Sequence, residues 1–103
     1  KSTGQFDRPY LGVSYAMITK ESALLNEVPA GAYVQNVISG SPAEKAGIKA
    51  GDIIIEVDGK NLVNDNVVLA TYINRKKIGE SVNIKIWRDK KEIEMKVVLE
   101  KKN

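Results

Sequence analysis

Two side chains have the spacing of a hydrolytic pair, Ser41 and Lys45. Residues four apart share one face of a helix, so the Lys45 amine could accept the proton of the Ser41 hydroxyl and make it a nucleophile. The chain has no histidine, which excludes a Ser-His-Asp triad and removes the commonest general base and metal ligand. It also has no cysteine, which excludes thiolate chemistry and disulfide bonds.

The residues around this pair predict a short helix over 41–47. Ser41 suits its N-cap, Pro42 its first turn, and Gly47 the left-handed position after its last turn. A capping role explains Ser41 better than nucleophilic chemistry does, and Lys45 is then a solvated side chain. We therefore expect no catalytic residue, no metal site and no cofactor in this chain.

The apolar run that follows predicts the centre of the fold. Residues 53–57 include three successive isoleucines and have no polar face. Gly51 and Asp52 bound the run on one side, and Asp58 and Gly59 bound it on the other, which is typical of a short strand buried on both faces. A strand of this kind needs cover above and below, so we expect it in the middle of the molecule.

Alternating apolar residues predict strands around this centre. They indicate one strand over 13–18, a second over 32–38, and a C-terminal hairpin with its turn at 88–91. The hairpin side chains expected to point inward are Val82, Ile84, Ile86, Ile93, Met95, Val97 and Leu99.

Two more helices are expected. A short one covers 19–26, and a longer one covers 65–77 with Asn64 or Asp65 as its N-cap. Gly79 ends the longer helix, whose apolar residues occupy more than one stripe. We therefore expect this helix to face both the core and a second partner.

The length and composition indicate one domain. The chain has 103 residues, of which 43% are hydrophobic and 28% charged, which is ordinary for a globular domain with one modest core. We assign 8–100 to the domain, 1–7 to a linker and 101–103 to a tail. Because the first residue is not methionine, we expect a piece of a longer protein or a processed product.

The charges and the apolar runs argue against two classes of partner. The net charge is only +3, and the basic residues of the last third are interleaved with acidic ones. This pattern does not predict nucleic-acid binding. No apolar run approaches the ~20 residues of a membrane span, so we expect no membrane contact.

The motif over 41–59 resembles a known family. Ser-Pro-Ala-x-x-Ala-Gly-Ile-x-x-Gly-Asp-x-Ile, followed by Ile-x-Val-Asp-Gly, is similar to the central motif of PDZ domains, above all those of bacterial HtrA-type (Deg) serine proteases. The resemblance covers roughly Arg8 to Leu99. It implies a mainly β, PDZ-like fold: a partly open barrel of five or six strands flanked by one long helix and one or two short ones.

The resemblance also implies a function. PDZ domains of this type bind the C-terminal carboxylate or the exposed apolar tail of a polypeptide, which adds as an extra strand. The expected parent is a serine endopeptidase of the cell envelope or periplasm, active in protein quality control, with its protease domain N-terminal to this chain. Two alternatives remain: a scaffold domain that pairs through its edge strand, or the PDZ domain of a membrane-embedded or C-terminal-processing protease. The isolated domain is expected to be a monomer.

By resemblance, the carboxylate-binding loop consists of Tyr10, Leu11, Gly12 and Val13. Consecutive backbone N–H groups in a turn can hold a carboxylate without histidine or metal, and Gly12 would permit the close approach. The alternative is that Gly12 only marks a tight turn before an edge strand. Arg8 is a candidate for long-range attraction of the carboxylate, or is simply a solvated side chain.

The same resemblance assigns the groove residues to Ser14, Tyr15, Asn66, Ala70 and Ile73, with Leu69 pointing to the core. Two departures from the family pattern matter. Asn66 stands where many signalling PDZ domains have a histidine, so their preference for Ser or Thr in the ligand does not transfer. Ile78 replaces a common proline, which leaves the end of the helix less defined.

Overall fold

The computed structural model describes residues 9–101, and all structural statements concern this part. Its elements follow one another in the order β1 (Pro9–Tyr10), β2 (Val13–Ile18), α1 (Lys20–Asn26), β3 (Gly31–Val37), α2 (Pro42–Ala46), β4 (Ile53–Val57), β5 (Lys60–Asn61), α3 (Leu69–Asn74), β6 (Ser81–Arg88), β7 (Lys91–Val98) and β8 (Glu100–Lys101).

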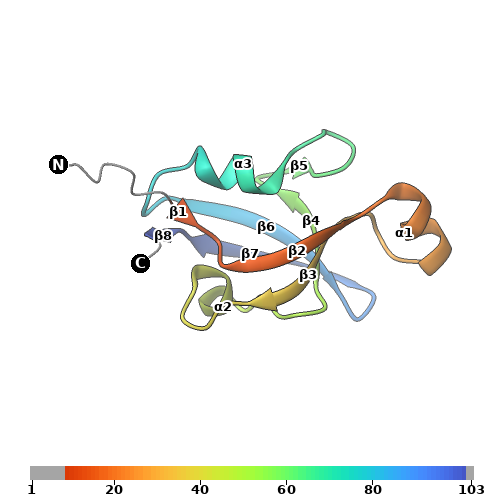
Figure 1. Cartoon of the computed structure of the whole chain (residues 1–103), viewed down its shortest axis with the longest axis horizontal. Coiled ribbons are helices and arrows are strands. Elements are labelled where there is room, and N and C mark those ends of the chain that lie inside the picture. The colour runs from red at the N-terminus through yellow and green to blue at the C-terminus, as the bar shows by residue number, and fades with distance from the viewer. Residues whose placement is uncertain (1–8, 102–103) are drawn as a thin grey trace.

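One antiparallel sheet organises the domain (Figure 1). Its strands lie in the order β2-β3-β4-β6-β7, and β5 pairs with β4 beside this path. The predicted central strand is confirmed as β4, where the side chains of Ile54 and Val57 are fully buried. Because β2 ends the order, one of its two edges has no partner strand in the described part of the chain.

A second, two-stranded sheet joins the two ends of the described chain. β1 pairs with β8, placing Pro9 opposite Lys101 and Tyr10 opposite Glu100. No sequence pattern predicts this pairing. It fixes the segment that leads into β2, and β8 ends at Lys101.

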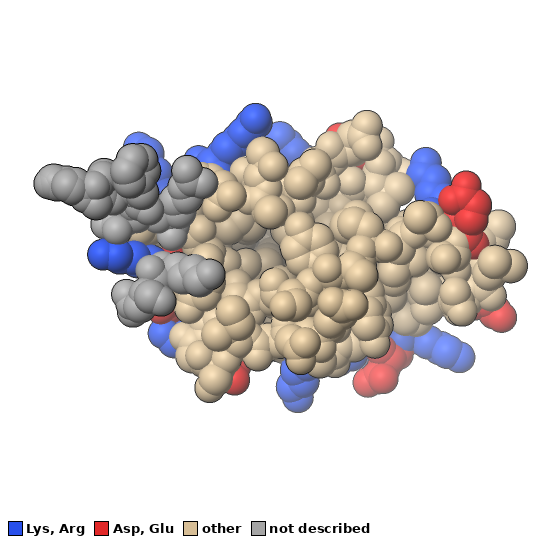
Figure 2. All heavy atoms as spheres, in the orientation of Figure 1, with Lys and Arg blue, Asp and Glu red and all other residues tan. Residues whose placement is uncertain are grey.

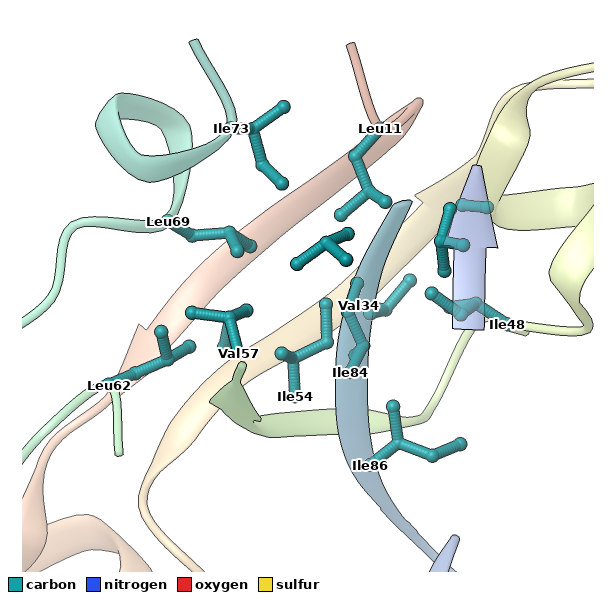
Figure 3. Close-up of a cluster of buried hydrophobic side chains, with 14 of the residues drawn as sticks. Leu11, Val34, Ile48, Ile54, Val57, Leu62, Leu69, Ile73, Ile84 and Ile86 are labelled. Atoms are coloured by element: carbon teal, nitrogen blue, oxygen red, sulfur yellow. The ribbon is translucent and has the colours of Figure 1, made fainter. Parts of the chain in front are cut away.

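The core lies between this sheet and α3. Figure 3 shows Leu69 and Ile73 of α3 pointing into the same interior as Leu11 and the β4 residue Val57. Ile84 and Ile86 of β6 fill the other side and are fully buried. The inward pattern predicted for the hairpin is confirmed, although Ile93 and Met95 are only half-buried.

The short helix α2 forms as predicted. The Ser41 hydroxyl accepts a hydrogen bond from the Glu44 N–H at 3.3 Å. Gly47 follows the last turn at φ +103°, in the left-handed region. Local side-chain chemistry was therefore sufficient to place both ends of this helix.

The helix predicted over 65–77 is wrong in both length and start, because α3 covers only Leu69–Asn74. The Asn61 side chain accepts hydrogen bonds from the N–H groups of Val63 and Asn64, and Asp65 accepts one from the N–H of Asn61. Asn and Asp side chains that bond the backbone in this way favour turns over helices. The helix therefore starts after the turn, with Val68 at its N-cap and no side-chain cap.

The β6–β7 hairpin has its turn where predicted. Arg88 pairs with Lys91, and the two residues between them, Asp89 and Lys90, have φ values of +51° and +64°. Two successive left-handed residues are characteristic of a type I′ turn, whose twist matches that of the flanking strands.

Candidate functional site

A hollow of about 210 Å³ lies between the 10–13 loop, the start of β2 and one face of α3. We call it the first hollow. Its lining residues are Pro9, Tyr10, Leu11, Gly12, Val13, Tyr15, Ile38, Leu69, Ala70, Ile73 and Asn74.

The 10–13 loop is anchored from behind, on the side of α2 and β3. The Leu11 carbonyl accepts a hydrogen bond from the Ala43 N–H at 2.9 Å, and the Gly12 carbonyl accepts one from the Ile38 N–H at 2.8 Å. Gly12 has φ +92°, and a Cβ there would overlap the Ser41 Cβ. Gly12 thus lets the loop pack directly against the N-cap of α2.

Three N–H groups of the same loop, those of Leu11, Gly12 and Val13, have no partner within residues 9–101. Those of Leu11 and Gly12 donate to no acceptor among the residues that the structure describes. The Ile38–Gly12 bond flanks the opposed residues Val13 and Val37, which makes them a non-hydrogen-bonded pair and turns the N–H and C=O of Val13 toward the open edge of β2. Three consecutive N–H groups at the first hollow are therefore free for an anion.

The helix wall of the first hollow comes from α3. Ala70 and Ile73 line it, as predicted for a helix that faces the groove between β2 and α3. Leu69 is buried in the core as expected and also reaches the lining. Asn74 lines it as well; it lies four residues after Ala70, so the helical period was a signal for it.

Not every residue predicted for the site lies there. Ser14 is exposed and does not line the first hollow. Asn66 lies in the turn before α3 with φ +56°, and it borders a different hollow. Arg8 lies outside the described residues. Ile38 lines the first hollow but was not predicted as a site residue, because nothing in its local sequence indicates that the end of β3 lies beside the 10–13 loop.

Tyr15 connects the two walls of the groove. Its hydroxyl oxygen accepts a hydrogen bond from the Ala70 N–H at 3.3 Å. The first N–H groups of a helix lack partners within the helix, and α3 has no side-chain cap. Tyr15 therefore acts as a partial N-cap of α3, because it accepts a hydrogen bond from one N–H of the first turn.

A polar cluster on the other side of α3 holds it to the rest of the domain. The Tyr72 hydroxyl donates to Asp58 Oδ2 at 2.5 Å, and Lys76 Nζ lies 2.9 Å from the same oxygen. Asp58 Oδ1 accepts from the Asn83 N–H at 2.8 Å. Partial burial opposes ionisation of Asp58, but the hydrogen bonds from Tyr72 and Asn83 and the Lys76 charge outweigh it and lower the pKa of Asp58.

The face that carries β2 is largely uncharged. Figure 2 shows it covered by residues other than Lys, Arg, Asp and Glu, with charged side chains around its rim. An apolar ligand segment lying along β2 would therefore meet few charges.

Ser41 and Lys45 do not form a hydrolytic pair. Ser41 is fully buried at the N-cap of α2, and Lys45 Nζ is 2.8 Å from Glu100 Oε2. In the described part of the chain, no cluster of three or more Asp, Glu, His or Cys residues is placed to hold a metal ion. No helix over residues 9–101 has the length and apolar character needed to cross a membrane.

The sequence profile of the PDZ domain family matches residues 9–99. The chain belongs to the PDZ domain family. This PDZ domain is 39% identical to "Serine protease Do-like HtrA" of Bacillus subtilis (strain 168), a match that covers 98% of this chain and 24% of the relative. It is 42% identical to "Probable periplasmic serine endoprotease DegP-like" of Bartonella henselae, with 94% of this chain and 19% of the relative covered. The chain thus spans about a quarter or less of these proteases, and it carries no catalytic domain itself.

Solved structures show the same fold. The PDZ domain of HtrA3, bound to the phage-derived ligand FGRWV, superposes with a TM-score of 0.77 at 27% identity and covers 92% of this chain and 88% of that chain. The HtrA-type protease AlgW with a decapeptide gives a TM-score of 0.78 at 23% identity, covering 97% of this chain and 31% of that chain. The predicted mainly β, PDZ-like architecture is therefore confirmed.

Proposed function

We propose that this PDZ domain binds the C-terminal carboxylate of polypeptides that end in an apolar residue. The observation that carries the proposal is the row of three free N–H groups, from Leu11 to Val13, at the mouth of an apolar hollow. Converging backbone N–H groups hold a carboxylate, and the hollow takes the last side chain. The open edge of β2 supplies further hydrogen bonds to the ligand backbone.

The relatives support this proposal and its setting. The ligand of the HtrA3 PDZ domain, FGRWV, ends in the apolar residue valine. The relatives named HtrA and DegP-like are serine proteases, and some are named periplasmic. The parent of this chain is then an extracytoplasmic HtrA-type protease, in which the PDZ domain recognises substrates or regulates the active site.

The experiment is a comparison of two peptides that differ only in their terminal charge. Ser-Ser-Ser-Ala-Ser-Val is titrated into the domain by calorimetry, once as the free acid and once as the C-terminal amide. The acid should bind with an affinity on the order of micromolar, about −8 kcal/mol. Amidation removes the anion and should weaken binding at least about ten-fold, roughly 1.4 kcal/mol. Equal affinities would refute carboxylate recognition.

The unpaired edge of β2 also favours a second candidate, a scaffold domain that pairs with a strand of another protein. Strand pairing alone needs no free carboxylate, because it uses backbone groups only. Equal binding of acid and amide would therefore support the scaffold. A parent of the membrane-embedded or C-terminal-processing type would share the same PDZ site, and the coding sequence upstream of Lys1 distinguishes it from an HtrA-type protease.

A further inference from the structure

A second hollow, of about 290 Å³, continues the groove beyond Tyr15. Met17 and Ile18 of β2 form one side, and Val67 and Val68 form the other. Met17 is 48% exposed and Val68 61% exposed, so two large apolar side chains border it without being buried by the domain itself. Exposed apolar side chains that gather at a hollow indicate a binding surface.

Tyr15 separates the two hollows. It belongs to the lining of both, together with Leu69. Its hydroxyl reaches across to the Ala70 N–H, so its ring spans the groove from β2 to the start of α3. A ligand that follows β2 from the first hollow to the second has to pass over this ring.

The spacing of a β-strand sets which ligand side chains meet these features. Val13, Tyr15 and Met17 are alternate residues of β2, so their side chains share one face. In an antiparallel pair, opposed side chains lie on the same face. Val13 lines the first hollow, Tyr15 is the divider and Met17 lines the second hollow. Ligand side chains over the two hollows are therefore four residues apart, with one in between facing the tyrosine ring.

We propose that the ligand is a polypeptide tail of at least five residues, and that the domain recognises its side chains at two separated positions. The last side chain enters the first hollow and a large apolar fifth-last side chain enters the second, while Tyr15 requires a small third-last residue. This inference rests on the proposed function, since the carboxylate fixes the register. It names Tyr15 and Met17 as specificity-determining residues of the groove.

Three peptides with a free carboxylate test the spacing. Ser-Ser-Ser-Ala-Ser-Val is the reference, Ser-Leu-Ser-Ala-Ser-Val has leucine at the fifth-last position, and Ser-Ser-Ser-Leu-Ser-Val has it at the third-last. Leucine at the fifth-last position should tighten binding about five- to ten-fold, as expected for partial burial of one large apolar side chain. Leucine at the third-last position should give no gain.

The outcomes separate this inference from the proposed function. In one outcome the acid form still binds better than the amide, but leucine at the fifth-last position gives no gain in affinity, or leucine at the third-last position gives an equal gain. Recognition at two positions is then refuted, and the carboxylate site stands. If acid and amide bind equally, the proposed function itself has failed.

Substitutions in the domain locate the effect. In Met17→Thr the advantage of the fifth-last leucine over the reference should fall to about two-fold or less, because one apolar wall is lost. Val98→Thr is the matched control: it exchanges an apolar strand residue that is 53% exposed on β7, away from the groove, and should keep the full advantage. In Tyr15→Ala the third-last leucine should become favourable. Thermal unfolding checks that each variant is folded. An advantage that survives Met17→Thr undiminished would exclude the second hollow.

Discussion

Gly12 has two separate reasons to be glycine. Its φ of +92° lies in the left-handed region, and a Cβ would overlap the Ser41 side chain. The loop therefore serves the fold and the proposed carboxylate site at once. The two interpretations suggested by the sequence, a binding loop or a tight turn, are not exclusive.

Replacing Gly12 by alanine should destabilise the domain more than the backbone angle alone explains. Gly40→Ala is the control, because Gly40 has φ +78° but open space around a new Cβ. The control should cost about 1–2 kcal/mol, the penalty for a left-handed L-residue. Gly12→Ala should cost at least about 2–4 kcal/mol, since overpacking adds roughly 1–3 kcal/mol. Urea unfolding measures both, and equal losses would show that the Ser41 contact yields without strain.

The two helices α2 and α3 differ in how well the sequence predicts them. Both ends of α2 were predictable, because Ser41, Pro42 and Gly47 act on their own neighbours. The length of the helix predicted over 65–77 was overestimated. Val67 fits the apolar pattern of the helix, but Asn61 and Asp65 stabilise a turn just before it. Propensity cannot rank these two local choices, and in the structure the hydrogen bonds of the Asn61 and Asp65 side chains form the turn.

Contacts between distant segments explain the remaining gaps. The β1–β8 pairing joins two strands of two residues each from opposite ends of the chain, which leaves no periodic signal. The loop residues Tyr10 to Val13 were predicted through the family resemblance, and so were Ala70 and Ile73; all of them line the first hollow. The second hollow and the Tyr15–Ala70 contact depend on the position of α3 relative to β2. No sequence motif predicts that position.

The Asp58 cluster predicts how the attachment of α3 depends on pH. The lowered pKa of Asp58 gives stability that is fully present above its ordinary pKa of about 3.8 and is lost as the pH falls through the folded value. Tyr72→Phe removes one hydrogen bond to the carboxylate and should cost about 0.5–1 kcal/mol at pH 7, a modest amount because the pair contacts solvent. Near pH 2 the difference between variant and parent should shrink.

The control for this prediction is Tyr33→Phe, because the Tyr33 hydroxyl has no hydrogen-bond partner within residues 9–101 and the residue is 42% exposed. Its free energy of unfolding should match that of the parent from pH 2 to 7. A Tyr72→Phe loss that stays constant over this range would mean that the hydroxyl stabilises α3 independently of the Asp58 charge.

A partly buried ion pair joins the segment before β4 to the end of β6. Arg88, at the end of β6, donates to both Asp52 oxygens at 2.8 and 2.7 Å and also to the Gly47 carbonyl at 2.7 Å. The Asp52 side chain is 3% exposed and accepts a further bond from the Lys49 N–H. The pair fixes the segment between α2 and β4 to the hairpin. The 10–13 loop packs against α2, directly before this segment.

Breaking this pair should therefore weaken the whole fold. Arg88→Met leaves the Asp52 carboxylate buried without its partner, and should cost about 2–4 kcal/mol, slightly below the ~3–5 kcal/mol of fully buried pairs because Arg88 keeps some contact with solvent. Arg88→Lys should recover only part of the loss, since lysine cannot donate to both oxygens in the planar geometry of arginine.

Lys45→Met is the control: it breaks the exposed pair with Glu100 and should change stability too little to resolve. Denaturant unfolding of the three variants measures the order of stabilities. If Arg88→Met and Lys45→Met were equally harmless, the bond from the Lys49 N–H would be enough to satisfy Asp52, and the ladder between β4 and β6 together with apolar packing would hold the hairpin without this ion pair.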